Sequence, residues 1–351
     1  MIPTNITKEA ILKAIEQADC EGVPKGRDAR SYHIYYGGKL YPPKYIISLA
    51  NRFINGYELS PGNFGGGAEA NNYLCKLGFD VVPAPAKTDE ITDLTVATIT
   101  LESSQSSSVS NQQRTHLLET VLSAYTSIDI LLFPAGYFYL RKHSPRHMQS
   151  IADTISKKLK QLHSSATVCF GIDCNMSVDQ LAIAVSQTGI CAMGRKFYPT
   201  DTEKGAIRAA ESYKTSEMGH SRFFEVRGKR IYLAVCYDCF GIRHLNIPNP
   251  GVDAVLDLAH RFCKRGEGPS GDVDFARKGF AGASQQWNCP VFGTAVFFDR
   301  PIPQNWPTGV LWSSSGKSPR HFKYQDNKLH WHSRKEILGQ ESVLCYEYIL
   351  P

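Results

Sequence analysis

The sequence predicts a two-part chain in which a small α+β unit precedes a larger layered α/β domain. Three observations favour this division. The length of 351 residues is enough for about two domains. Residues 83–92 are rich in proline and alanine, and apolar periodicity stops there. Beyond them strand-like and helix-like segments alternate, as in α/β layer proteins. We therefore expect a head domain at 1–82, a linker at 83–92 and a second domain at 93–351.

The composition limits the class of protein. Hydrophobic residues make up 42% of the chain, which is enough for a sizeable core and argues against global disorder. No apolar run approaches the ~18 residues that cross a bilayer. The first residues carry no secretion signal, so the ten cysteines are expected as free thiols in a reducing cytoplasm. The net charge of +6 permits anionic partners without requiring nucleic acid.

The first unit begins with a helix pattern and continues with a hairpin pattern. Thr7 precedes apolar residues at helical spacing, which predicts a helix start there. A Gly-Gly pair at 37–38 separates two tyrosine-rich runs, as in a tight hairpin. The elements expected are a helix after Thr7, a hairpin over 32–41, a helix opened by Pro42 and Pro43, a helix around 72–77 and a short strand over 79–82.

The charge of this unit is uneven. Residues 22–52 hold six Lys and Arg against Asp28 alone, which is six minus one, or +5. Tyrosines are interleaved with these bases, and such mixing suits phosphate contact and base stacking. The alternative is a solvated hairpin with core tyrosines. The side chains expected to bind nucleic acid are Lys25, Arg27, Arg30, Lys39 and Lys44.

The order of motifs in this unit is distinctive. It reads GVPKGR, a Tyr-rich hairpin, GKLYPPKYIISLAN and GGGAEANNYLCKLGF. This order resembles the N-terminal head domain of McrA-like HNH nucleases and other modular restriction-type proteins, over roughly residues 5–82. The resemblance implies a sensing or docking head in front of an effector. It also implies nucleic-acid binding and a part in defence against foreign DNA.

The second unit alternates strands and helices from Leu94 onward. An apolar stretch at 342–350 ends the chain on a strand that must be paired or covered. The strands expected before it are 96–100, 128–133, 167–172, 181–185, 189–193, 223–226, 231–235 and 291–298, and the helices are 115–125, 148–162, 252–262 and 275–287.

Two side chains at strand ends could carry chemistry. Cys236 closes the apolar run 231–235, and Lys196 follows another strand-like stretch. A free thiol, with a pKa of ~8.5, is mostly protonated at neutral pH, and a nearby ammonium favours the thiolate and stabilises an oxyanion. Taken alone, Cys236 could be a small buried hydrophobe and Lys196 a surface charge. Cys236 and Cys239 also spell Cys-x-x-Cys, but a zinc or redox role needs a second pair or a thioredoxin-like context, and we expect neither a metal nor a cofactor.

Three ordered blocks resemble the carbon–nitrogen hydrolase (nitrilase/amidase) superfamily. They are residues 129–134, residues 194–199 and residues 235–238, and the resemblance covers most of 93–351. It implies a four-layer α-β-β-α sandwich that commonly forms dimers. It also implies that Cys236 is the nucleophile and that Lys196 stabilises the oxyanion. The residues that it implies beside the substrate are Ala135, Tyr237 and Asp238.

The first block departs from the family pattern. It normally ends in Pro-Glu, and that glutamate is the general base, whereas here Ala135 follows Pro134. Losing a general base typically costs about 10²–10⁴ in rate. The family's second glutamate is expected at Glu211, with Glu203 as an alternative register. The candidate substitutes for the base are Glu211, Glu203 and His220.

Two functions from different classes remain open at this point. The first is a cytoplasmic hydrolase that cleaves a C–N bond in a small amide-like molecule through a Cys236 thioester, slowly because of Ala135. The second is a ligand sensor or scaffold that has lost catalysis and carries a nucleic-acid-binding head. A nucleic-acid enzyme is disfavoured, since no nuclease motif is apparent.

Overall fold

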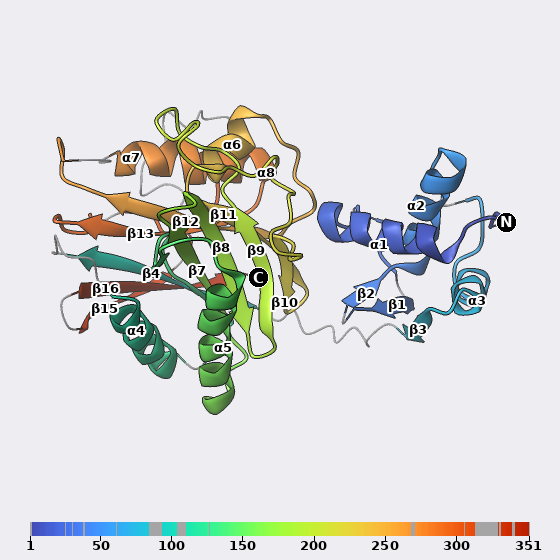
Figure 1. The fold of residues 1–351 in the computed structure, drawn as a ribbon, viewed down its shortest axis with the longest axis horizontal. Helices are drawn as coiled ribbons and strands as arrows, with labels where there is room; N and C mark the ends of the chain where they lie inside the picture. The colour runs from blue at the N-terminus through green and yellow to red at the C-terminus, as the bar shows by residue number, and fades with distance from the viewer. Residues whose placement is uncertain are drawn as a thin grey trace. The chain divides into compact units, whose positions relative to one another are not determined.

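The computed structural model describes residues 2–350 except 25, 30, 38, 61, 84–92, 104–109, 126, 268–270, 305, 313–328, 330 and 339–340. The chain separates into two compact units, Met1–Ile91 and Thr92–Pro351 (Figure 1). Most of the expected linker at 83–92 lies outside the described residues.

The first unit has the helix and strand order expected from its sequence. Its elements are α1 (Lys8–Glu21), β1 (Tyr32–Tyr36), β2 (Lys39–Tyr41), α2 (Pro43–Asn55), α3 (Ala68–Lys76) and β3 (Asp80–Pro83). The Thr7 hydroxyl accepts a hydrogen bond from the Ala10 backbone N–H and so caps α1. The strands form an antiparallel sheet in the order β2-β1-β3. Ile11, Ile34 and Ile46 lie fully buried in the core between this sheet and the helices.

The second unit is built around one continuous set of strands. Its elements are β4 (Leu94–Ser103), α4 (Asn111–Ala124), β5 (Ile130–Leu132), β6 (Phe138–Leu140), α5 (Pro145–Gln161), β7 (Thr167–Cys174), β8 (Asp179–Ser186), β9 (Gly189–Arg195), β10 (Phe223–Val226), β11 (Lys229–Val235), α6 (Asp238–His244), β12 (Ala254–Phe262), α7 (Asp272–Phe275), the π-helical turn η1 (Ala276–Phe280), α8 (Ala281–Trp287), β13 (Val291–Phe298), β14 (Gly309–Val310), β15 (Trp331–Leu338) and β16 (Glu341–Leu350). The main strand order is β10-β11-β12-β13-β4-β5-β7-β8-β9.

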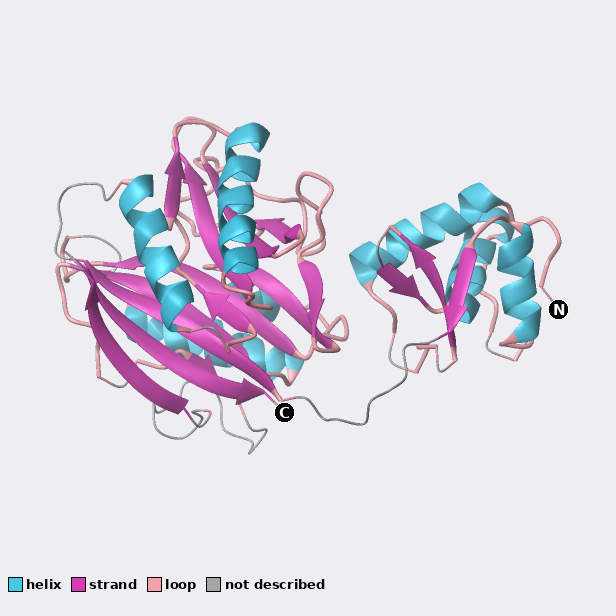
Figure 2. Cartoon of the chain, turned by 90° about the horizontal axis from the view of Figure 1, so that it is seen from below, coloured by secondary structure: helices cyan, strands magenta, loops and turns pink. Residues whose placement is uncertain are grey.

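The strands fold into two facing layers that helices cover on both outer sides. β11 packs against β8 and β9, which lie at the other end of the strand order. Helices α4 and α5 lie on one side of the strands, and α6 to α8 lie on the other (Figures 1 and 2). One apolar core fills the space beneath α6 to α8 and between the layers, and a second lies beneath α4 and α5. This arrangement confirms the layered α/β class and the α-β-β-α order expected from the sequence.

The prediction of a helix over 252–262 is wrong. These residues form β12, which pairs in parallel with β11 on one edge and with β13 on the other. A central strand covered on both faces is apolar almost throughout, so its apolar residues also fit helical spacing. Pairing on both edges decides in favour of the strand.

The C-terminal strand is covered within the chain itself. β16 pairs with β4 along its whole length and with β15 on its other edge. The strand therefore needs no second copy of the chain to pair its backbone. Within the described ranges, none of the helices is long and apolar enough to cross a bilayer.

Candidate active site

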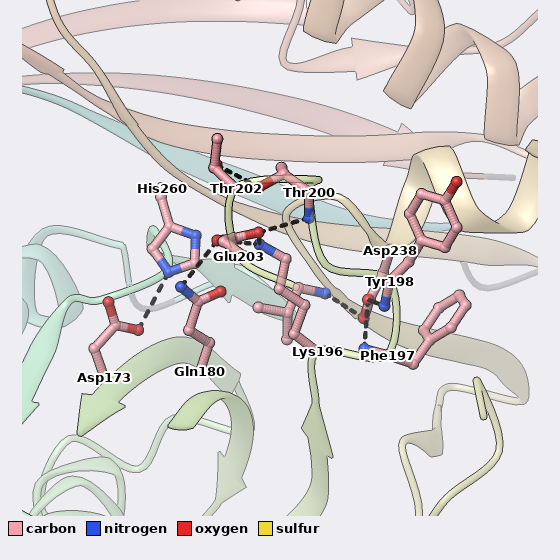
Figure 3. Close-up of polar contacts among 11 residues, drawn as sticks. Asp173, Gln180, Lys196, Phe197, Tyr198, Thr200, Thr202, Glu203, Asp238 and His260 are labelled. Carbon is pink, nitrogen blue, oxygen red and sulfur yellow. Dashed lines mark hydrogen bonds and ion pairs between the residues drawn. The ribbon is translucent and has the colours of Figure 1, made fainter. Parts of the chain in front are cut away.

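Four strands bring reactive side chains to one place in the second unit. Cys236 follows the end of β11, and Lys196 follows the end of β9. His260 lies near the end of β12, and Asp173 near the end of β7. In the view of Figure 3, His260 and Asp173 lie on one side of Lys196 and its partner Glu203. The site therefore combines a thiol, an imidazole, an ammonium and two carboxylates.

Cys236 sits at a sharp turn between β11 and α6. Its φ of 53° lies in the left-handed region, which non-glycine residues rarely adopt. Its backbone N–H donates to the Leu258 carbonyl of β12 over 2.9 Å. The residue is only 8% exposed. This geometry holds the thiol at the strand end beside β12.

The surroundings of the Cys236 thiol lower its pKa. Burial raises the pKa of the thiol, but the positive charge of Lys196 and hydrogen bonds from the side chain and backbone of His260 outweigh burial and lower it. A thiolate is the nucleophilic form of cysteine. The surroundings therefore favour a reactive thiol over an inert buried one.

Lys196 forms a tight ion pair with Glu203. Its Nζ lies 2.7 Å from Oε1 and 2.6 Å from Oε2 of Glu203, and the residue is 1% exposed. Burial lowers the pKa of Lys196, but the charges of Cys236 and Glu203 raise it by more. Burial raises the pKa of Glu203, but Lys196 and the backbone N–H of Thr200 reduce it to about 2. Both groups are therefore charged at neutral pH, and Glu203 is a weak base.

Glu203, the alternative register, is the glutamate that contacts Lys196. Glu211, our first choice, is exposed, and no contact between its side chain and Lys196 or Cys236 is found among the described residues. The Ala210 backbone N–H, just before Glu211, donates to the Lys196 carbonyl. The backbone of His220 pairs with that of Glu217. Proximity therefore favours Glu203 over Glu211 as the partner of the ammonium.

Asp238 connects the two strand ends. Its Oδ1 accepts from the backbone N–H groups of Phe197 and Tyr198 over 2.8 and 3.1 Å. Its Oδ2 accepts from the Val235 backbone N–H over 3.0 Å and from Arg222 over 2.6 Å. Both oxygens are used by protein donors, and the residue is fully buried. Asp238 therefore positions the loops that carry Lys196 and Cys236, where we had expected it to contact substrate.

Tyr237 forms an aromatic wall beside the thiol. Its ring stacks on Phe240 with 4.3 Å between centroids and 8° between planes. Lys196 Nζ lies 5.7 Å from the centroid of the Tyr237 ring. Burial raises the pKa of the phenol, as does the neighbouring Cys236. The Tyr237 ring therefore lies beside both Lys196 and Cys236.

His260 and Asp173 form a second ion pair, and His260 also contacts the thiol. His260 Nε2 lies 3.2 Å from Asp173 Oδ1, with side chains 20% and 17% exposed. Burial lowers the pKa of His260, but Asp173 and the contact with Cys236 raise it to about 10. The imidazole is therefore protonated at neutral pH while it faces the Cys236 thiol. Neither His260 nor Asp173 is among the site residues expected from the sequence.

Ala135 lies next to this pair. Its backbone N–H donates to the Ala259 carbonyl, one residue before His260, over 3.1 Å. A Cβ placed on the following residue, Gly136, would lie 2.8 Å from Asp173 Oδ2. The loop that lacks the expected glutamate therefore packs against the carboxylate of Asp173.

Asp257 is a buried carboxyl behind the nucleophile. It is 0% exposed, and the Cys239 thiol contacts its carboxyl group. Burial raises the pKa of Asp257 well above its usual range, and the charge of Cys236 raises it further. Both effects favour the protonated carboxylic acid over the carboxylate. Within the described residues no cluster of three His, Cys, Asp or Glu side chains is placed to hold a metal ion.

The expected nucleic-acid contacts of the head are only partly described. Lys25 and Arg30 lie outside the described residues. Lys39 pairs with Asp19 at 2.9 Å, and Arg27 donates to Ser48 and lies 3.9 Å from Glu58. The Lys44 ammonium lies 5.4 Å from the centroid of the Phe64 ring. The positive charges of these described Lys and Arg side chains are therefore partly neutralised by carboxylates, or the side chains pack on aromatic rings.

Comparisons with known proteins give a family for the head and several similar structures. Residues 4–83 match the ScoMcrA-like N-terminal head domain family, which agrees with the resemblance of residues 5–82. No curated protein matches the chain. An amidase from Nesterenkonia sp. is 12% identical, with 72% of this chain and 89% of that chain covered and a TM-score of 0.46. A carbon–nitrogen hydrolase from Helicobacter pylori G27 is 12% identical, with 73% and 89% covered and a TM-score of 0.44. A CN-hydrolase superfamily protein from Xanthomonas campestris is 14% identical, with 61% and 78% covered and a TM-score of 0.42.

Proposed function

We propose that the second unit hydrolyses a C–N bond in a small amide-like molecule through a thioester on Cys236. The observation that carries this proposal is the buried Lys196 ammonium at the strand end beside the Cys236 thiol, whose pKa it lowers. Acyl transfer needs an activated nucleophile and a donor for the developing oxyanion. Lys196 can serve both needs because its pairing with Glu203 keeps it charged.

The surroundings of the thiol favour a small substrate. Cys236 is 8% exposed and stands beside the stacked rings of Tyr237 and Phe240. These stacked rings exclude water and bulky groups from the thiol. In the resulting low-dielectric surroundings, Lys196 stabilises the oxyanion more strongly. A short aliphatic amide fits these limits better than a peptide does.

The test is a panel of short aliphatic amides and nitriles assayed with the wild type and Cys236→Ala. The wild type should release the acid product and show an acyl adduct on the Cys236 peptide by mass spectrometry. Cys236→Ala should lose both, and Cys75→Ala, at an exposed cysteine of the head, should lose neither. Absence of turnover and adduct in the wild type, with an amide still raising its melting temperature, would favour the ligand sensor.

We also propose that the head docks nucleic acid and serves defence against foreign DNA. The supporting observation is the exposure of three tyrosines of β1, Tyr32, Tyr35 and Tyr36, at 42%, 50% and 44%. Exposed aromatic rings beside lysines suit base stacking and phosphate contact. Binding of labelled DNA or RNA, followed by anisotropy, should weaken as salt rises. Equal binding by a Tyr35→Ala/Tyr36→Ala variant would exclude stacking on these rings.

We propose the dimer from the resemblance to carbon–nitrogen hydrolases, and the compartment from the cysteines. We propose a closed two-fold dimer of the second unit in the cytoplasm, and all ten cysteines are free thiols, as a reducing compartment would keep them. Light scattering checks the dimer, since a mass near 39 kDa at high concentration would correspond to one chain.

A further inference from the structure

The site lacks the carboxylate that the resembled family uses as its base, yet it holds a charged pair close to that position. Residue 135 is alanine, and its backbone is hydrogen-bonded to Ala259, next to His260. The Asp173 carboxylate lies against Gly136, the residue after Ala135. β7 and β12 are not neighbours in the strand order, so the contact between Asp173 and His260 joins the two layers across the site.

We infer that His260, oriented by Asp173, is the general acid and base of this site and replaces the missing carboxylate at position 135. The inference rests on the proposed function and assigns a further catalytic residue to it. The thiol, the imidazole and the carboxylate then form a Cys236–His260–Asp173 triad, and the positive charge of Lys196 also acts on the thiol.

Geometry distinguishes His260 from the other candidates for the base. Glu203 has both oxygens engaged by Lys196 and is also bonded by Thr200 and Gln180. A carboxylate held in this way is a poor proton acceptor. Glu211 is exposed. His260 is the group that contacts the thiol and also has a carboxylate behind its ring.

The groups facing His260 come from three elements. Asp173 reaches it from β7 and Cys236 from the end of β11, and Lys196 acts on the thiol from the end of β9. Tyr139 of β6 lies near Asp173. Burial raises the pKa of the Tyr139 phenol most, and the negative charge of Asp173 raises it further. The negative charges of Asp173 and the thiolate favour imidazolium, and the positive charge of Lys196 favours thiolate.

This arrangement gives a balanced reaction with water as the second substrate. The Cys236 thiolate attacks the carbonyl carbon, a C–S bond forms, and the C=O electron pair moves to an oxygen that faces Lys196. The C–N bond then breaks as the leaving nitrogen takes the proton of His260. Water attacks the thioester next, His260 takes its proton, and the C–S bond breaks to restore thiolate and imidazolium. The products are a carboxylic acid and an amine or ammonia.

The two halves of this cycle need different protonation of His260, and the thiolate provides the switch. While the thiolate is present, its charge supports imidazolium. Once the sulfur is acylated that charge is gone, so the neutral imidazole becomes more favourable and can accept the proton of water. Asp173 keeps the ring oriented in both states.

The experiment measures thiol reactivity and turnover separately. The rate of Cys236 alkylation by iodoacetamide is followed across pH by mass spectrometry of its peptide, in the wild type, His260→Gln and Asp173→Asn. We expect both variants to need a higher pH for half-maximal alkylation. His147→Gln, at an exposed histidine of α5, should match the wild type. Thermal unfolding of each variant shows whether a loss of Cys236 reactivity comes from misfolding.

Turnover separates this inference from the proposed function. With an amide hydrolysed by the wild type, His260→Gln should lose about 10²–10⁴ in rate. Imidazole added to His260→Ala should restore part of that loss, which a merely structural role would not allow. A folded His260→Gln with unchanged alkylation profile and unchanged turnover would overturn the inference and leave Cys236 chemistry intact. Absence of any acyl adduct on Cys236 would instead overturn the proposed function, whatever the alkylation profile of His260→Gln shows.

Discussion

The backbone at Cys236 shows how one residue can be held for reaction. A φ of 53° at a residue with a Cβ costs on the order of 1–3 kcal/mol, so surrounding contacts must fix it. Two hydrogen bonds provide such contacts. The Cys236 backbone N–H donates to the Leu258 carbonyl, and the Val235 backbone N–H donates to the Asp238 carboxylate. They turn the chain sharply where β11 ends and bring the thiol to His260.

At the residue scale the sequence identified the thiol and the ammonium but not the imidazole. Cys236 and Lys196 each follow a recognisable apolar strand, so their positions at strand ends could be predicted. His260 and Asp173 are 87 positions apart, and only the facing of two layers brings them together. The available signal was Asp257 and His260 interrupting an apolar run, which we interpreted as helical periodicity.

Replacement of Glu203 by glutamine should change stability in a pH-dependent way. The folded pKa of Glu203 is about 2 against an ordinary 4.5, a difference worth about 3 kcal/mol. Because the folded pKa is lowered, this stability is present above about pH 4.5 and is lost as pH falls toward 2. Glu203→Gln should therefore be less stable than wild type near pH 7, and the two should converge in acid. Urea unfolding at several pH values measures this difference.

The control for this prediction is Glu225→Gln, at an exposed position of β10. It should track the wild type at every pH. A Glu203→Gln protein whose deficit stays constant from pH 7 to pH 3 would show that the ion pair with Lys196 is not the source of the effect.

At the scale of elements, the site depends on where parallel strands end. β11, β12 and β13 run in parallel, so the ends of β11 and β12 reach the same edge. The sequence predicted most of these strands because buried β-formers are bounded by turns. It could not predict that β12 is a strand, because a strand buried on both faces has no alternation to distinguish it from a helix.

Asp238→Asn should weaken both the fold and the thiol. Arg222 and Asp238 are both fully buried and lie 2.6 Å apart, so removing one charge leaves the other uncompensated. Loss of one partner of a buried pair typically costs about 3–5 kcal/mol. The same change loosens the link between the Lys196 loop and the end of β11, so Cys236 alkylation at neutral pH should slow. Urea unfolding and the alkylation rate give the two readouts.

A matched control is Asp153→Asn, at an exposed position of α5. This variant should leave both readouts unchanged. If Asp238→Asn lowered stability but left the alkylation rate of the folded protein at the wild-type value, Asp238 would hold the fold without positioning the thiol.

At the scale of the molecule, the chain holds separate hydrophobic cores. The head core comes from residues between Ile2 and Phe79, and the two cores of the second unit come from residues between Leu94 and Leu350. No described buried apolar residue belongs to both units. The sequence anticipated this division through composition and a break in periodicity, both of which are local signals. The pairing of β16 with β4, which joins the two ends of the second unit, could not be predicted from such local signals.

The two units should fold independently, because each buries its own apolar residues. Expressed alone, residues 92–351 should keep the wild-type rate and pH profile of Cys236 alkylation, since Lys196, Glu203, His260 and Asp173 all lie within that fragment. Residues 1–91 should unfold cooperatively by circular dichroism, although a unit of this size has only marginal stability. The full chain should then show two thermal transitions that match those of the fragments. A single transition in the full chain, together with a 92–351 fragment that exposes its core to a hydrophobic dye, would mean that the head stabilises the site. The head would then act on the reaction through stability as well as through what it docks.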